Sequence, residues 1–134
     1  MDSQAVDRIR ASFAFVVAAG ADAGMLFYND LFARAPTIRP LFPADMTAQA
    51  QKLIATLGVI VDALSDGETI RPELQRLGLA HRAYGAQPVH YAVVEESLLA
   101  MLRELAGGRL EVQTEAAWRS AYALVAGAMI RAAG

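Results

Sequence analysis

Two histidines are the only imidazoles in this chain of 134 residues, which contains no cysteine. His81 follows Leu77 and Leu74 at intervals of four and seven residues, so all three fall on one face of a helix. An imidazole on an apolar helix face can ligate a metal such as haem iron, or it can be a core histidine satisfied by a backbone carbonyl. Without a thiolate, any metal must be bound through nitrogen or oxygen. His90 lies just after Pro88, in a first helical turn that is usually solvated.

Two more polar side chains fall on apolar helix faces. Tyr28 lies between Phe27 and Phe32 in the sequence, and Gln49 precedes Leu53 by one turn. A phenol O–H and an amide N–H are donors that stabilise a partly negative gas ligand in a dry cavity. The alternative is that Tyr28 only packs its ring and Gln49 faces solvent, and the pattern alone favours this alternative.

The remaining residues exclude several functions. No acid pair, Ser-His-Asp arrangement, phosphate loop or HExxH run has a usable spacing. The chain has 12 Lys+Arg against 14 Asp+Glu, a net charge of −2. It therefore lacks the basic stripe that is typical of a nucleic-acid binder. The uncharged apolar stretches at about 13–21 and 121–130 are shorter than the ~20 residues that span a bilayer, and the acidic N-terminus is unlike a secretory signal. A cytoplasmic protein without a nucleic-acid or membrane partner is expected.

Helices must position these residues, because apolar side chains recur every three or four positions and no run alternates with period two. Ala and Leu are abundant, which favours helix further. We expect one all-α domain over residues 1–134, large enough for a single core. The predicted helices are 3–19 with Ser3 as N-cap and Gly20 as stop, 22–34 capped by Asp22, a short turn at 36–42, 47–64, 69–84 with Pro72 in its first turn, 88 to the break at Gly107-Gly108, and 114–133.

Together these residues resemble the bacterial globins, specifically the single-domain haemoglobins related to the haem domain of flavohaemoglobins. The resemblance spans nearly the whole chain. Residues 26–32 (LFYNDLF) with Pro36 are similar to the family's distal tyrosine motif and interhelical proline, and Phe42 of the segment RPLF is similar to the phenylalanine that wedges the haem. Trp118 and Tyr122 also fit the last helix of the family.

The ordered spacing of four residues is the most specific part of the resemblance. Gln49 and Leu53 are similar to the distal glutamine and the leucine one turn on, His81 to the iron-ligating histidine, and Tyr91, preceded by Pro88, to the tyrosine that backs it. Tyr28, Gln49, His81 and Tyr91 follow one another at intervals of 21, 32 and 10 residues, without a gap against the family pattern.

The resemblance implies a globin fold, a three-over-three helical sandwich holding haem b (iron protoporphyrin IX). His81 would bind the iron and donate from its other ring nitrogen to a carbonyl or to Tyr91. Tyr28 and Gln49, with Leu53 beside them, would donate hydrogen bonds to the gas ligand. The porphyrin would be held by apolar contacts and by one cation for a propionate: Phe42, Leu53, Leu57, Leu77 and Val94, with Lys52 as the cation.

Two departures from the flavohaemoglobin pattern affect the expected chemistry. Ala133 stands where those proteins have a glutamate, and no Asp or Glu follows Glu115. A carboxylate there would make the imidazole more anionic, so its absence weakens the case for peroxidase-like or fast dioxygenase chemistry. The chain also ends without the flavin and NADH domain, so any turnover is expected to need a separate reductase.

Three functions are therefore compared. The first is reversible binding of dioxygen or another diatomic ligand, such as nitric oxide or carbon monoxide, for storage, delivery or sensing. The second is a nitric oxide dioxygenase that takes electrons from a partner. The third is a haem-free regulatory module with the globin fold. The sequence leaves the physiological ligand open, and it equally allows a monomer or a homodimer.

Overall fold

The computed structural model describes residues 1–65, 67–83 and 87–133. Within these residues there are helices and no strands, which confirms the all-α prediction. The elements are α1 (Ser3–Ala19), α2 (Ala21–Arg34), the 3₁₀ helix η1 (Pro36–Leu41), α3 (Thr47–Asp62), α4 (Gly67–Ala83), α5 (Pro88–Leu105) and α6 (Val112–Ala133).

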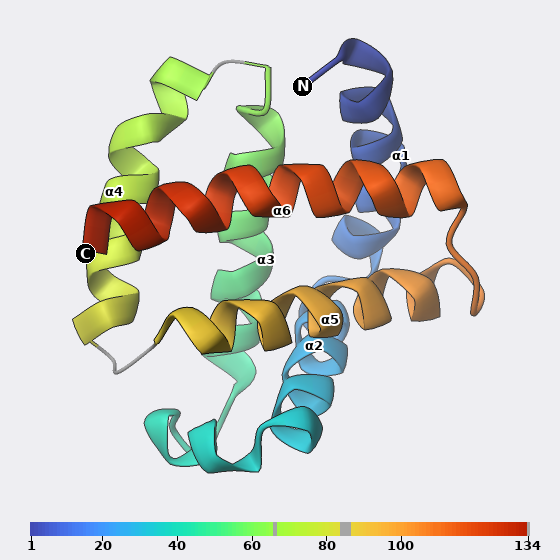
Figure 1. Cartoon of the computed structure of the whole chain (residues 1–134). Coiled ribbons are helices and arrows are strands. Elements are labelled where there is room, and N and C mark those ends of the chain that lie inside the picture. The colour runs from blue at the N-terminus through green and yellow to red at the C-terminus, as the bar shows by residue number, and fades with distance from the viewer. Residues whose placement is uncertain (66, 84–86, 134) are drawn as a thin grey trace.

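The helices form two layers that cross steeply. Figure 1 shows α5 and α6 side by side, running across α1, α3 and α4. Helix α4 packs mainly on α6, whereas α3 packs on α2 and α1. Within the described residues, α3 and α4 are therefore held by different partners, and neither is a main packing partner of the other.

The helix ends differ from the predicted ones in small ways. The N-cap of α1 is Asp2 rather than Ser3, because the Asp2 carboxylate accepts from the Ala5 N–H at 2.8 Å. Gly20, at φ 59°, ends α1 as predicted and also precedes α2, so Asp22 lies inside the first turn of α2 instead of capping it.

Three later helix boundaries also moved. Helix α3 ends at Asp62, and α4 begins at Gly67, which puts Pro72 inside α4 rather than in its first turn. Helix α6 begins two residues earlier than predicted, because the Glu115 N–H already bonds the Glu111 carbonyl. The predicted end at Tyr84 lies outside the described residues.

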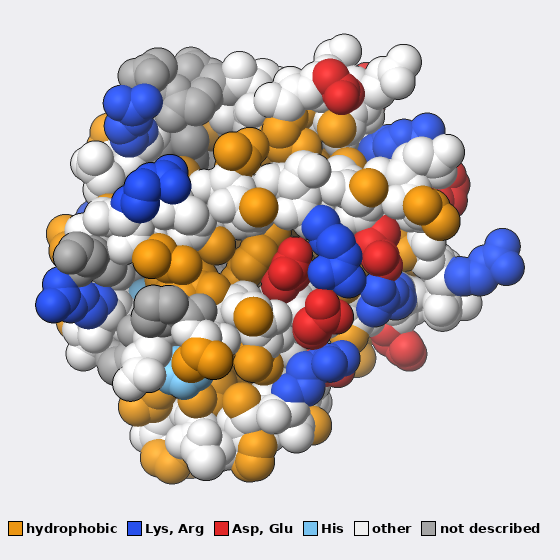
Figure 2. Space-filling model, in the orientation of Figure 1, with side chains coloured by type: hydrophobic (Ala, Val, Ile, Leu, Met, Phe, Trp, Pro, Cys, Tyr) orange, Lys and Arg blue, Asp and Glu red, His pale blue; other side chains and the backbone are white. Residues whose placement is uncertain are grey.

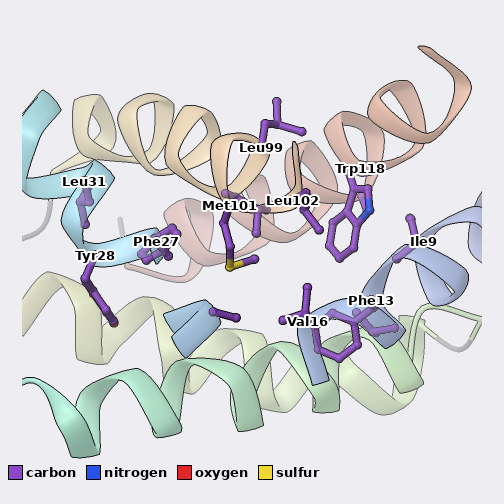
Figure 3. Close-up of a cluster of buried hydrophobic side chains, with 14 of the residues drawn as sticks. Ile9, Phe13, Val16, Phe27, Tyr28, Leu31, Leu99, Met101, Leu102 and Trp118 are labelled. Atoms are coloured by element: carbon purple, nitrogen blue, oxygen red, sulfur yellow. The ribbon is translucent and has the colours of Figure 1, made fainter. Parts of the chain in front are cut away.

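The core lies between the two layers and draws on every long helix except α4 (Figure 3). Trp118 is 4% exposed, packs its ring against Phe13, and donates from its indole N–H to the Ser12 hydroxyl at 2.8 Å. Burying apolar side chains here is the main stabilising contribution to the fold. The labelled members of this cluster are Ile9, Phe13, Val16, Phe27, Tyr28, Leu31, Leu99, Met101, Leu102 and Trp118.

Two glycines allow helices to cross with their backbones almost in contact. A Cβ on Gly24 of α2 would lie 2.6 Å from the Ala50 carbonyl oxygen of α3. A Cβ on Gly78 of α4 would lie 2.3 Å from the Met129 carbonyl oxygen of α6. The α2–α3 and α4–α6 crossings therefore require the absence of a side chain at these positions.

The visible surface carries a cluster of charges over α5 and α6 (Figure 2). Arg119 of α6 pairs with Glu95 and Glu96 of α5, and Arg103 of α5 pairs with Glu115 of α6. Exposed pairs of this kind contribute little individually but fix the alignment of two helices as a network. Among the described helices, none alone has the length and apolar composition to cross a membrane; α1 and α2 together do, but they meet at a bend of 100°.

Candidate functional site

Tyr28 and Gln49 meet at the α2–α3 crossing. The Gln49 amide donates to the Tyr28 hydroxyl at 3.1 Å. Tyr28 is 5% exposed and Gln49 is half-buried. Because Tyr28 follows Gly24 by one turn and Gln49 precedes Ala50, the close crossing sets this distance.

Burial raises the pKa of Tyr28, and the hydrogen bond from Gln49 offsets only part of that rise. The phenol therefore remains protonated at physiological pH. Its oxygen accepts from Gln49, which leaves its own O–H available to a ligand.

Three aromatic rings hold the Tyr28 ring in place. Phe27 meets it edge-on at 5.0 Å, Phe42 edge-on at 5.5 Å, and Phe32 stacks on it at 5.9 Å. Phe32 and Phe42 also meet edge-on at 5.3 Å. These are the favoured geometries for aromatic pairs, so the tyrosine is held rigidly and its hydroxyl position is defined.

Arg39 fixes the segment that carries Phe42. Its guanidinium donates to the carbonyls of Phe42, Pro43 and Ala44 at 3.3, 2.9 and 3.2 Å. The same group lies 4.9 Å from the centre of the Phe32 ring. One side chain thus orders three consecutive backbone carbonyls and one of the rings around Tyr28.

A buried polar contact holds α2 against α5. Ser97 is fully buried and donates to the Asp30 carboxylate at 2.8 Å. Arg34 donates to the same carboxylate from the next turn of α2. Since Asp30 lies two residues after Tyr28, this contact helps set how far α2 is rotated toward the site.

His81 lies on α4, a helix that packs mainly on α6 rather than on α2 or α3. Its side chain is exposed, and its Nδ1 lies 2.8 Å from the Leu77 carbonyl oxygen. A carbonyl can only accept, so Nδ1 carries the proton and Nε2 is left with a free lone pair. This is the tautomer that a metal-ligating histidine needs.

Tyr91 of α5 packs near His81, with the ring centres 6.4 Å apart. The sequence left two acceptors open for the second ring nitrogen of His81, and the structure pairs that nitrogen with the Leu77 carbonyl rather than with Tyr91. Tyr122 of α6 donates its hydroxyl to the Tyr91 backbone carbonyl at 2.5 Å, which locks α5 and α6 together at this point. Burial raises the pKa of the Tyr91 phenol.

The residues predicted to contact a porphyrin lie on α3, α4 and α5 and, for Phe42, directly after η1. All of the predicted apolar contacts are half-buried, which is typical of side chains that line a binding surface rather than fill a core. Lys52 is exposed and makes no hydrogen bond or ion pair with the part of the chain that the structure describes. These apolar residues are Phe42, Leu53 and Leu57, followed by Leu77 and Val94.

The donor set fits haem better than a bare metal ion. No group of three or more His, Cys, Asp or Glu residues that could hold a metal occurs among the described residues. A single free imidazole nitrogen, half-buried apolar side chains and two hydrogen-bond donors at the α2–α3 crossing match a cofactor that supplies the other metal ligands itself.

Comparison with known proteins identifies the family of this chain. The sequence matches the Globin family model over residues 26–129. The chain belongs to the globin family. It is 30% identical to a flavohemoprotein from Halalkalibacterium halodurans over 108 residues, which cover 78% of this chain but only 26% of that protein. The chain thus spans about a quarter of the length of this curated relative.

Solved globin structures share the fold. A bacterial globin from Campylobacter jejuni superposes with a TM-score of 0.84 at 20% identity, covering 98% of this chain and 96% of that one. A flavohemoglobin from Malassezia yamatoensis with bound FAD and haem gives 0.79 at 21% identity, covering 98% of this chain and 36% of that one. The predicted globin fold, with its three-over-three sandwich, is confirmed.

Several residues that build the site were missed by sequence reasoning. Gly24, Gly78, Arg39 and the pair Asp30–Ser97 had no assigned role. The glycines had a usable signal, because an isolated glycine inside a helical pattern often marks a close backbone approach. Arg39 and Ser97 had none, since their partners are backbone carbonyls and a residue 67 positions away.

Proposed function

We propose that this globin holds haem b and reversibly binds dioxygen or another diatomic ligand, for storage, delivery or sensing. The observation that carries the proposal is the buried Tyr28 hydroxyl with Gln49 bonded to it at 3.1 Å. The His81 ring, with its Nδ1 directed to the Leu77 carbonyl, further supports the proposal. When bound, haem supplies an iron with one coordination position open to a gas.

His81 is the proposed iron ligand, through Nε2. Its Nδ1 partner is a neutral carbonyl at 2.8 Å rather than a carboxylate. A carboxylate would make the imidazole more basic, whereas a carbonyl orients the ring without adding negative charge. This supports ligand binding over redox turnover, in line with Ala133 standing where flavohaemoglobins have a glutamate.

Tyr28 and Gln49 are the proposed donors to the gas ligand. Each hydrogen bond contributes about 1 kcal/mol net, and somewhat more when the acceptor carries partial charge. Two such bonds slow ligand dissociation by about tenfold or more, since ~1.4 kcal/mol corresponds to a factor of ten. The rings around Tyr28 keep water from competing for the same donors.

The remaining proposed contacts hold the cofactor. Phe42, Leu53 and Leu57 would cover the porphyrin from the side of α3, and Leu77 and Val94 from the side of α4 and α5. Lys52 would pair with a propionate at the exposed edge, with a gain below about 1 kcal/mol because solvent screens it. We propose that residues 1–134 act as one globin domain in the cytoplasm, as a monomer or homodimer.

The second candidate is a nitric oxide dioxygenase. Its supporting observation is the similarity to a flavohemoprotein, together with distal donors that suit both functions. In that reaction nitric oxide, dioxygen and one electron give nitrate, and a separate reductase would supply the electron. His81, bonded to a carbonyl, provides less of the electron donation that such redox chemistry favours.

The experiment compares the dioxygen dissociation rate of the wild type with those of Tyr28→Phe and Gln49→Leu. Each variant should release dioxygen about five- to tenfold faster, by loss of one hydrogen bond. Tyr122→Phe is the matched control, because it removes a half-buried phenol whose partner is the Tyr91 carbonyl, and its rate should stay within about twofold. Equal rates in all four proteins would contradict the assigned donors.

A turnover assay separates the two candidates. Nitrate formation from nitric oxide is measured with an added flavin reductase and NADH. Turnover at the rate of reductase-coupled flavohaemoglobins would favour the dioxygenase, and stable reversible oxygenation without turnover would favour binding. A protein that retains no haem would instead leave the globin-fold regulatory module as the remaining function.

A further inference from the structure

A hollow lies at the opposite end of α5 from Tyr91. It is bordered by α1, by the end of α5, by the loop between α5 and α6, and by the first turn of α6. Its volume is about 330 Å³, within the range of small-molecule sites. None of the residues proposed to hold haem or a gas lines it, so this site is independent of the function proposed above.

Polar groups without partners line one side of the hollow. Thr114 is 8% exposed, and its hydroxyl makes no hydrogen bond with the part of the chain that the structure describes. Arg109 is exposed and likewise has no ion pair or hydrogen bond there. No buried side-chain N or O atom in the described ranges lacks a partner, so this hydroxyl is reached by solvent rather than orphaned. A hydroxyl that is open to solvent and has no internal partner can donate to a ligand in the hollow.

The local electrostatics favour a single negative charge. The first helical bond of α6 joins the Glu115 N–H to the Glu111 carbonyl, so the N–H groups of residues 112–114 precede it and favour an anion. Arg8 pairs with Glu111 at 3.5 Å, where the Glu111 side chain is 77% exposed. Such an exposed pair is weak and exchanges readily for another carboxylate. The charged lining is Arg8, Arg109 and Glu111, which sum to one positive charge.

The other side of the hollow is apolar. Phe15 of α1 is 59% exposed although it is a large hydrophobic residue, and it lines the hollow with the half-buried Leu110, while Leu102 of α5, only 2% exposed, lies beneath them. Gly107 and Gly108, with φ of 85° and 99°, turn the chain sharply between these helices and bring Arg109 to the rim. A ligand that matches both sides must join one anionic group to an apolar body.

We propose that this hollow binds a small monocarboxylate with an unbranched apolar tail. The carboxylate accepts from the Arg109 guanidinium and the Thr114 hydroxyl, and the tail lies along Phe15 and Leu110. A dianion is disfavoured because Glu111 shares the rim and the lining carries only one net positive charge.

The indole N–H resonance of Trp118 can be used to detect binding at this site. Trp118 is the only tryptophan, and its indole N–H donates to Ser12, whose side chain lines the hollow. Octanoate is titrated into the haem-loaded, carbon monoxide-bound ferrous protein, which is diamagnetic, and the indole N–H resonance is followed. Octan-1-ol, which has the same tail without charge, is the ligand control.

We expect a saturable shift with octanoate and binding at least about fivefold weaker for octan-1-ol. Arg109→Gln should weaken octanoate binding about five- to tenfold, since it removes one charge-assisted hydrogen bond. Arg131→Gln, the same charge change near the C-terminal end of α6, should leave the affinity unchanged. Ala11→Phe, which fills the hollow from an exposed helical position, should abolish the shift.

Three results would overturn the proposal. Octan-1-ol binding as tightly as octanoate would show only an apolar surface. Equal weakening by Arg109→Gln and Arg131→Gln would show non-specific attraction to positive charge. A linear response without saturation, with the protein folded, would show that there is no site. Each of these results is obtained from the Trp118 resonance and leaves the gas-binding proposal untouched.

Discussion

Replacing Gly24 with alanine should disturb both stability and ligand release, because it adds a Cβ at the α2–α3 crossing. That Cβ would lie 2.6 Å from the Ala50 carbonyl oxygen and 2.8 Å from the Ala50 Cα. Ordinary van der Waals contact begins at 3.4 Å, so the helices must separate by about 0.8 Å. Both clashing atoms belong to backbone, which cannot rotate away.

The same displacement acts on the distal hydrogen bond. Gln49 is adjacent to Ala50 and lies 3.1 Å from the Tyr28 hydroxyl. A separation of about 0.8 Å would stretch this distance to about 3.9 Å, beyond any useful hydrogen bond. Losing about 1 kcal/mol of ligand stabilisation should raise the dioxygen dissociation rate about fivefold.

The expected stability change is the sum of two opposing effects. Overpacking costs about 1–3 kcal/mol, while alanine gains about 1 kcal/mol over glycine in helix propensity. Gly24→Ala should therefore lower the free energy of unfolding by up to about 2 kcal/mol. Gly58→Ala in α3 is the control, because its Cβ would meet only the Phe13 ring at 3.9 Å and should stabilise by up to about 1 kcal/mol.

Urea unfolding and stopped-flow dioxygen release measure these two effects. If Gly24→Ala were as stable as Gly58→Ala and released dioxygen at the wild-type rate, the reasoning from the helix crossing would be refuted.

Three further predictions concern the supporting residues. Gly78→Ala, whose Cβ would lie 2.3 Å from the Met129 carbonyl, should displace α4 and speed haem transfer to an acceptor globin; an unchanged transfer rate would contradict this. Arg39→Met should leave the carbonyls of residues 42–44 without their guanidinium donor and lower the urea midpoint of unfolding. An unchanged midpoint would show that solvent replaces these hydrogen bonds with no loss of stability. Because burial raises the pKa of Tyr28, its phenol stays protonated and the dioxygen release rate should be constant from about pH 6 to 9.5. The free energy of unfolding should fall only above about pH 10, because the phenol ionises first in the unfolded chain. A release rate that rises near neutral pH would contradict this.

The fold was predictable because helical periodicity dominates this sequence. The first helix was placed at its observed bounds, since Val6, Ile9 and Phe13 repeat regularly and Gly20 stops it. Helix starts were less predictable. Asp2 and Ser3 are both good caps, and only the geometry of the Ala5 N–H decides between them.

The resemblance to the globins marked Tyr28, Gln49 and His81 as candidates by their types and order, and their role stays a prediction. The contacts that hold them could not be predicted. Which ring nitrogen of His81 is bonded, and to what, depends on the Leu77 carbonyl one turn earlier, which every helix offers and no residue type marks. The contact between Asp30 and Ser97 joins residues 67 positions apart, and a single sequence carries no record of such pairs.

His81 is the proposed ligand of haem iron in this fold. The most direct measurement is the visible spectrum of the haem-reconstituted protein, reduced and then exposed to carbon monoxide, for the wild type, His81→Gly and His90→Ala. We predict a Soret band that shifts with carbon monoxide in the wild type and in His90→Ala, whose imidazole only accepts from the Gln87 N–H at 3.0 Å. His81→Gly should lose this spectrum and regain it with added imidazole. An unaltered spectrum in His81→Gly, or no stoichiometric haem in the wild type, would contradict the account.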